Sequence, residues 1–358
     1  MVVTLAPDDI VATRAEGEAN AREPLLVLEP LIEFLGAHGL DAAADLSAEP
    51  VGDGHSNVTF LLSTGVVLRR PPRGPLPPSA HDVLREARLL RALEPTPVRV
   101  PRVFAVCDDE SVIGAPFYVM DQVKGAVITD TIPEPLDNPE QRAAIADQLI
   151  DALVELHAVD WTTVGLEGFG KPTGYLERQL RRFLGLWEIN KTREIDEVEI
   201  VGDWLKTNMP QSPPATIVHG DYRLGNTIMA PGAPARLEAI LDWEMATIGD
   251  PLADLGYMML HWIRPGDKVG YFNLQSVTSL DGFPSRAEMI ARYERRSGRS
   301  MQALNWYVTL ALWKAIVFME GNYKRAISGA TDDPYLKSFG EGVIELAARA
   351  LEVSQNGL

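Results

Sequence analysis

Hydrophobic and polar residues follow two different patterns along the chain, and the change falls near residue 125. Upstream, short runs of β-type residues are separated by turn-forming residues, which predicts strands. These runs are residues 59–62, 66–68 and 117–120. Two other segments, 31–40 and 79–94, carry apolar residues at helical spacing. The pattern therefore predicts a small unit of mixed strands and helices.

Helical spacing dominates the rest of the chain. The segment 137–161 repeats apolar residues at helical spacing, with Asn138 as the expected N-cap and Pro139 in the first helical position. Further helices are predicted at 175–187, 202–209, 250–262, 285–298 and 336–353. Convincing strands are confined to residues 215–220, 226–230 and 236–244. A larger, mostly helical unit that contains one hairpin is expected.

These patterns indicate an α+β fold with a small mixed N-lobe and a larger helical C-lobe. We expect an N-terminal extension over residues 1–30, the N-lobe over 31–122 and the C-lobe over 123–358. The longest apolar tract, residues 306–319, is interrupted by Lys314 and is shorter than the roughly 20 residues of a membrane span. We interpret it as a buried helix.

Composition and net charge narrow the classes of molecule that this chain could bind. The chain has 358 residues, 46% of them hydrophobic, and a formal net charge of −17. This charge opposes general affinity for nucleic acids or anionic membranes. A single cysteine, Cys107, excludes an intrachain disulfide and suits a reducing compartment. The first residues carry acidic groups where a secretory signal needs basic ones, so a cytoplasmic location is expected.

Candidate chemistry is concentrated in the stretch IVHGDYRLGNTIMA, residues 217–230. If residues 226–230 and 236–244 fold into an antiparallel hairpin, Asp242 returns to the neighbourhood of Asn226 and Asp221. Two carboxylates and an amide oxygen are hard ligands of the kind that Mg²⁺ accepts while a substrate's phosphates supply the others. Asp221 could also accept a proton from an attacking hydroxyl group.

The same stretch resembles a known family. HGDYRLGN fits the H-x-D-x-x-x-x-N catalytic loop of kinases, and ILDWE stands where protein kinases carry D-F-G. The series HGD, GN, LDWE and GDPLADL resembles the aminoglycoside phosphotransferase family, which also includes choline, homoserine and fructosamine kinases. GDGHSNVTF, VLRRPP, LHAVDW and YLERQLRRF are closer still to the kinase-like domains fused to some acyl-CoA dehydrogenases. The resemblance covers residues 45–260 and implies a two-lobed protein-kinase-like fold that uses ATP and Mg²⁺.

The resemblance assigns the glycine-rich segment VGDGHSN to the nucleotide phosphates. Gly52 and Gly54 would allow close backbone approach, while Ser56 and Asn57 could add side-chain donors. Asn57 replaces the third glycine of G-x-G-x-x-G, although Asn tolerates left-handed conformations better than most residues. A lone G-x-G is more often only a turn.

The main departure from the kinase pattern lies at the third strand of the N-lobe. Aligning VVLR with V-A-I-K puts Arg69 where kinases carry lysine, and Glu86 on the following helix becomes its ion-pair partner. Arginine still binds phosphate but is a larger, planar donor. The alternative is an arginine that faces solvent at a strand end. Arg70 should point to the opposite face by strand alternation.

Two further residues have structural interpretations under the kinase hypothesis. The histidine equivalent to His219 braces the catalytic loop in the family, and a buried, satisfied histidine is the simpler interpretation. Asp254 resembles the residue that ties this loop down, against the alternative of an ordinary helix-surface carboxylate. Asp250, before Pro251, is expected to be an N-cap.

The resemblance implies an active small-molecule O-phosphotransferase. Asp221 would be the base, Asn226 and Asp242 would hold Mg²⁺, and Arg69 would contact the phosphates. The alternative is a nucleotide-binding module without transferase activity, motivated by Arg69 and Asn57. A protein kinase is a poorer interpretation because no A-P-E-like segment follows Asp242.

The sequence leaves the acceptor open. Aminoglycoside phosphotransferases suggest an aminoglycoside-like cation, whereas the dehydrogenase-fused domains suggest a hydroxy acid or its CoA thioester. A hydroxylated small molecule is the expected partner in either case. The sequence does not indicate an oligomeric state.

Overall fold

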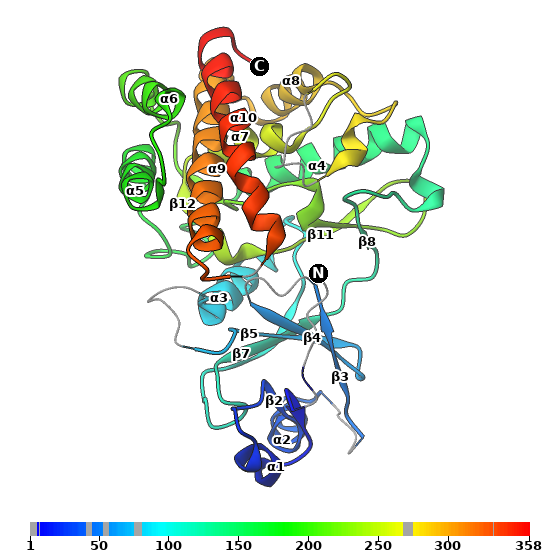
Figure 1. Ribbon diagram of the computed structural model, residues 1–358. Coiled ribbons are helices and arrows are strands. Elements are labelled where there is room, and N and C mark those ends of the chain that lie inside the picture. The colour runs from blue at the N-terminus through cyan, green and yellow to red at the C-terminus, as the bar shows by residue number, and fades with distance from the viewer. Residues whose placement is uncertain are drawn as a thin grey trace. The chain divides into compact units, whose positions relative to one another are not determined.

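The computed structural model describes residues 6, 8–40, 45–52, 57–74, 81–267, 275–331 and 333–358. The chain divides into two units, Met1–Lys124 and Gly125–Leu358 (Figure 1). The elements of the first unit are β1 (Ile10–Val11), α1 (Arg14–Ala19), β2 (Leu26–Val27), α2 (Leu28–Ala37), β3 (Ala48–Val51), β4 (Val58–Leu62), β5 (Val66–Arg70), α3 (Val83–Leu93), β6 (Val103–Cys107) and β7 (Phe117–Asp121).

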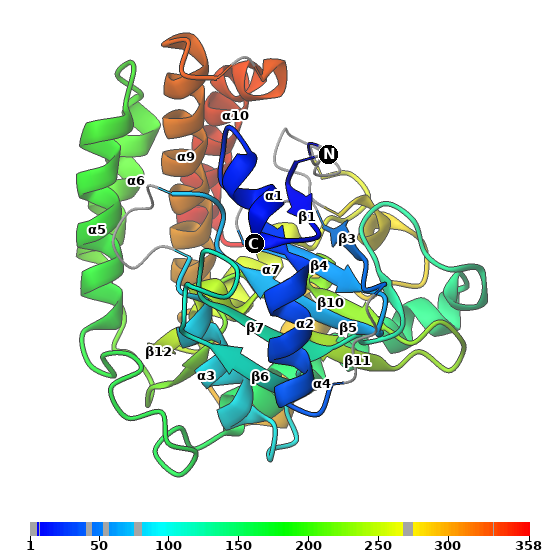
Figure 2. The same cartoon turned by 90° about the horizontal axis from the view of Figure 1, so that it is seen from below.

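The first unit is built on an antiparallel sheet of five strands in the order β3-β4-β5-β7-β6. Helix α2 crosses one face of this sheet (Figure 2) and buries Leu31 and Leu35 there, as their helical spacing predicted. Leu25 and Leu26, from the segment expected to be an extension, belong to the same core. The strands β3 and β6 were not predicted from the sequence.

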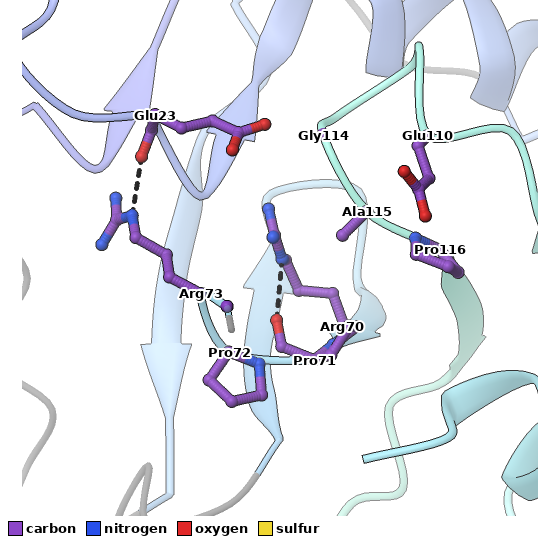
Figure 3. Close-up of a pocket in the computed structure, with 10 residues that line it drawn as sticks. Glu23, Arg70, Pro71, Pro72, Arg73, Glu110, Gly114, Ala115 and Pro116 are labelled. Carbon is purple, nitrogen blue, oxygen red and sulfur yellow. Dashed lines mark hydrogen bonds between the residues drawn. The ribbon is translucent and has the colours of Figure 1, made fainter. Parts of the chain in front are cut away.

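Strand β5 directs successive side chains to opposite faces of the sheet. Leu68 lies in the core beneath α2, and Arg69 pairs with Glu86 of α3. Arg70 is buried, and its guanidinium donates to the carbonyl oxygens of Pro71, Leu25 and Ile113. Figure 3 shows its bond to Pro71. Arg70 therefore ties the N-terminal segment to the sheet on the face opposite to Arg69.

We expect Arg70→Met to lower the free energy of unfolding by about 2–4 kcal/mol, because buried carbonyl oxygens would lose charged donors. Burial already lowers the pKa of Arg70 to about 10, so the side chain is still charged at neutral pH. Urea denaturation would measure the change. The exposed Arg91→Met on α3 is the matched control and should stay within about 0.5 kcal/mol. Equal effects of the two substitutions would contradict a fastening role for Arg70.

The second unit is mostly helical. Its elements are β8 (Ala126–Val127), η1 (Glu134–Leu136), α4 (Pro139–Ala158), α5 (Tyr175–Asn190), α6 (Asp196–Thr207), β9 (Thr216–Val218), η2 (Leu224–Asn226), β10 (Thr227–Met229), β11 (Leu237–Ile240), η3 (Trp243–Met245), β12 (Thr247–Gly249), α7 (Leu252–His261), η4 (Ser276–Ser279), α8 (Arg286–Ser297), α9 (Leu304–Ile327) and α10 (Pro334–Asn356). Asn138 caps α4 as predicted, because its side chain accepts from the Gln141 N–H.

The apolar tract at residues 306–319 lies within α9, which confirms the prediction of a buried helix. Helix α9 packs against α5, α6, α7 and α10, which flank it in Figure 1. Across the parts of the chain that the structure describes, no helix has the length and apolar character needed to cross a membrane.

The predicted hairpin is also present. Strands β10 and β11 pair antiparallel, with Thr227 opposite Ile240, and β8 extends their sheet. A separate pair joins β9 to β12. The sequence did not indicate β8 or β12, because two or three residues are too few to show an alternating pattern. The β9–β12 pair matters for the site, since β9 leads directly into the loop that begins at His219.

Candidate functional site

The loop of residues 219–226 follows β9 and is fixed from within. His219 is fully buried; its Nδ1 accepts from the Asp221 N–H at 3.2 Å, and its Nε2 donates to the Leu241 carbonyl at 2.8 Å. Gly220 has a φ of 89°, and a Cβ there would lie 2.8 Å from the Met245 carbonyl oxygen. Only glycine fits this position, so the sharp turn that presents Asp221 depends on it.

Asp254 holds the same loop from α7. It is fully buried, and its two carboxylate oxygens accept from the backbone N–H groups of His219 and Gly220, at 2.7 Å each. A carboxylate that accepts several N–H groups is strongly anchored. The predicted alternative, a helix-surface carboxylate, does not describe Asp254. Asp250, expected as the N-cap, lies one residue before the cap at Pro251, although its Oδ1 accepts from the Leu252 N–H at 3.0 Å.

His157 of α4 completes this support, and the sequence reasoning did not assign it a role. Its Nε2 donates to Asp254 at 3.1 Å, and its Nδ1 accepts from the Tyr293 hydroxyl at 2.7 Å. Burial lowers the pKa of His157, which keeps the imidazole neutral with this pattern of donation. The sequence pattern could have identified His157 as a buried residue, because it lies at helical spacing on the buried side of α4, beside Leu153 and Leu156.

The two oxygens of Asp221 have different surroundings. Oδ2 accepts from Asn226 Nδ2 at 2.7 Å, and the same amide nitrogen donates to the Asp221 carbonyl at 2.8 Å. Oδ1 is buried and has no hydrogen-bond partner among the described residues, with Arg223 Nε at 3.7 Å. Burial, followed by the charge of Asp221, raises the pKa of the nearby Tyr257. An oriented carboxylate thus has one oxygen available to a ligand.

Asn226 and Asp242 lie at the same end of the hairpin. The Leu241 N–H donates to the Asn226 carbonyl at 2.8 Å, so Asp242 is the next residue along the partner strand. Asp242 has a left-handed φ of 62° where the chain leaves β11. Since the Asn226 amide nitrogen faces Asp221, its amide oxygen is turned away from that carboxylate. An amide oxygen beside a carboxylate fits a Mg²⁺ site completed by substrate oxygens.

Asn226 and Asp242 alone do not supply a complete set of metal ligands. Among the described residues, no group of three or more His, Cys, Asp or Glu side chains could hold a metal ion. A cation at Asn226 and Asp242 would therefore need ligands from a substrate or from water, as Mg²⁺ commonly does at phosphate sites.

The N-terminal unit brings Arg69 and Glu86 together. Arg69 Nε lies 3.0 Å from Glu86 Oε2, and its Nη1 lies 3.2 Å from the hydroxyl of Thr59 on the neighbouring strand. Glu86 is only 3% exposed, so the pair is well shielded from solvent. Arg69 therefore does not extend freely into solvent.

The glycine-rich segment is described only in part. Gly52 has a φ of 86°, and a Cβ on it would meet no atom within 4 Å. The side chain of Asn57 is buried, and neither of its polar atoms has a hydrogen-bond partner among the described residues. Gly54 and Ser56 lie outside the described residues.

A small pocket adjoins the loop within the C-terminal unit. It has a volume of about 20 Å³. Its lining residues are Tyr175, Gly220, Ala253, Asp254, Tyr257, Tyr307, Leu310, Ala311 and Lys314. Sequence reasoning noted Lys314 only as an interruption of the apolar tract, because no spacing rule relates residue 314 to residue 220.

Comparison with known proteins gives a consistent result. The model of the phosphotransferase enzyme family matches residues 47–307. A crystal structure from Ralstonia eutropha JMP134, provisionally assigned as an aminoglycoside phosphotransferase, is 32% identical with a TM-score of 0.79. That match covers 92% of this chain and 98% of the other. A macrolide 2'-phosphotransferase type I is 19% identical with a TM-score of 0.59, over 93% of this chain and 98% of that one. These matches confirm the predicted two-lobed kinase-like fold.

The curated relatives are much longer proteins. Human acyl-CoA dehydrogenase family member 11 is 34% identical over 91% of this chain, but the match covers 42% of that protein. Mouse acyl-CoA dehydrogenase family member 10 is 34% identical over 82% of this chain and 28% of that protein. The chain thus spans less than half the length of these relatives.

Proposed function

The chain belongs to the phosphotransferase enzyme family, and we propose that it is a small-molecule kinase that transfers the γ-phosphoryl group of ATP to a hydroxyl group, with Asp221 as the base. The single observation that carries the assignment is the carboxylate of Asp221. One of its oxygens is held by Asn226, and the other is buried without a hydrogen-bond partner among the described residues.

The described geometry supports a direct transfer. A hydroxyl group at Asp221 Oδ1 would be oriented by hydrogen bonding and would give up its proton as the phosphoryl group arrives. The bonds from Asn226, His219 and Asp254 hold the loop before substrate binds, so little reorganisation is needed at the reaction step. This mechanism needs no covalent intermediate.

The remaining roles are assigned on the same basis. Asn226 and Asp242 would hold Mg²⁺, which supplies neutralisation of the phosphate charge when bound. Arg69, oriented by Glu86 at 3.0 Å, would contact the phosphates, with Gly52, Gly54, Ser56 and Asn57 as the phosphate loop. The buried amide of Asn57, which has no hydrogen-bond partner among the described residues, supports a ligand near this segment.

The competing proposal is a nucleotide-binding module without transferase activity. It rests on arginine at position 69 and asparagine at position 57, where kinases carry lysine and glycine. The organised loop around Asp221 favours the active enzyme, because a silent module has no need for an oriented base beside Asn226.

The test is a coupled assay for ADP release with ATP, Mg²⁺ and a panel of aminoglycosides, amino alcohols, sugars, nucleosides, hydroxy acids and hydroxyacyl-CoA thioesters. We expect at least one acceptor to stimulate ADP release, and excess EDTA to abolish it because the phosphate charge is no longer neutralised. Mass spectrometry should find one added phosphate on that acceptor. ATP binding by calorimetry with no phosphorylated product across the panel would instead support the silent module.

A further inference from the structure

Lys314 places a cation in an otherwise apolar part of α9. The preceding residue, Trp313, and the two that follow, Ala315 and Ile316, are buried. Lys314 itself is partly buried and lines the pocket that also contains Gly220 and Asp254. An aliphatic residue would suit the helix packing equally well, so the charge calls for another explanation.

The described partners of the Lys314 ammonium group are neutral. Nζ lies 3.2 Å from the amide oxygen of Gln179 and 4.8 Å from the centre of the Phe183 ring. Among the described residues, no carboxylate oxygen forms an ion pair with Nζ, which would need a distance of 4.0 Å or less. An ammonium group has three N–H donors, and one amide oxygen satisfies only one of them.

The surroundings make this charge costly without an added anion. Burial, with a smaller contribution from Arg182, lowers the pKa of Lys314 to about 8. The charges of Asp254 and Asp221 act in the opposite direction, which places Lys314 within electrostatic reach of the proposed base. Arg223 Nε lies 3.7 Å from Oδ1 of Asp221. Lys314 and Arg223 are thus two cations that both act electrostatically on this carboxylate.

From these contacts we infer that Lys314 determines acceptor specificity by binding a carboxylate group of the hydroxylated substrate. The inference rests on the proposed function, since the hydroxyl group of the same molecule would lie at Asp221. Tyr257 and Tyr175 line the pocket, and their side chains would have to move apart to admit the segment between the two groups, because the present volume is about 20 Å³. A carboxylate would supply the acceptors that the ammonium group lacks and would favour its charged form.

A cationic acceptor is disfavoured by the same arrangement. An aminoglycoside would bring ammonium groups beside Lys314 and Arg223, and like charges at close range repel strongly when partly buried. The carboxylate of Asp254 also lines this pocket, but it is fully buried and already accepts from His219, Gly220 and His157, so it offers no free oxygen to a substrate ammonium group. The inference therefore selects hydroxy acids over aminoglycosides.

Binding measurements test this without requiring turnover. Calorimetry would compare a series of short hydroxy carboxylates, the methyl ester of each, and an aminoglycoside, on the full chain with Mg²⁺ and a non-hydrolysable ATP analogue. We expect at least one hydroxy carboxylate to bind about 10-fold to 100-fold more tightly than its ester, the range for one hydrogen-bonded charge pair. Lys314→Met should remove this preference, and Lys314→Arg should retain part of it.

The matched control is Lys324→Met, which makes the same change at an exposed position of the same helix. It should leave the acid-to-ester preference unchanged, and thermal unfolding would verify that each variant folds. Equal affinity for acid and ester, an equal effect of Lys314→Met on both, or no binding of any hydroxy carboxylate would overturn the inference. ADP release with another acceptor would then leave the proposed function standing, whereas Lys314-dependent binding without ADP release would overturn the proposed function alone.

Discussion

Asp221→Asn is expected to lower kcat by about 10²-fold or more, the usual contribution of a general base. The amide keeps the size of the side chain, and its oxygen can still accept from Asn226 Nδ2, which now lies at 2.7 Å. What it loses is the ability to take a proton at Oδ1. The affinity for ATP, measured by calorimetry, should change little, because Asp221 is assigned to the hydroxyl group and not to the nucleotide.

The control for this substitution is Asp203→Asn, which alters an exposed carboxylate on α6 that pairs with Lys206. Its kcat should equal that of the parent protein. Circular dichroism and the unfolding midpoint would verify that Asp221→Asn leaves the fold intact. If Asp221→Asn retained kcat within a few-fold of the parent protein, another residue would have to be the base.

The parts of the site that could be predicted are those held by short-range geometry. His219, Asp221 and Asn226 lie within eight residues, so their mutual contacts follow from one tight loop. Arg69 and Glu86 are 17 residues apart, and their pairing was predicted from the resemblance to the kinase V-A-I-K pattern, on a strand and a helix whose own periodicities are clear. In both cases the hydrophobic pattern fixes the backbone, and the backbone fixes which side chains can meet.

The parts that were missed depend on packing between distant elements. His157 and Asp254 are 97 residues apart, and nothing local to α4 indicates that its histidine meets a carboxylate of α7. Lys314 lines a pocket with Gly220 for the same reason. Arg70 was expected only to face away from Arg69, and two of its three carbonyl partners, Leu25 and Ile113, are 45 and 43 residues away in the sequence. Such contacts are products of the tertiary fold.

The support of the catalytic loop leads to the second large expected effect. Asp254→Asn should lower the free energy of unfolding by at least about 2 kcal/mol, because hydrogen bonds to a charged group are each worth about 1.5–3 kcal/mol. One carboxylate oxygen accepts from Gly220, and the other accepts from His219 and His157. Whichever way the amide is turned, its NH₂ group faces an N–H donor, so at least one bond is lost and a donor is left buried.

The same substitution should lower kcat while ATP affinity is retained, since the loop that carries Asp221 would no longer be fixed at His219 and Gly220. Hydrogen exchange separates this from general destabilisation. The substitution should raise the exchange rates of the His219 and Gly220 amides, relative to the parent protein, by more than it raises those of the α9 amides. His157→Ala removes one of the three donors to Asp254 and should give a smaller change of the same kind. If Asp254→Asn altered neither the exchange at Gly220 nor the unfolding free energy, the loop would have to be held by His219 and the β9–β12 pair alone.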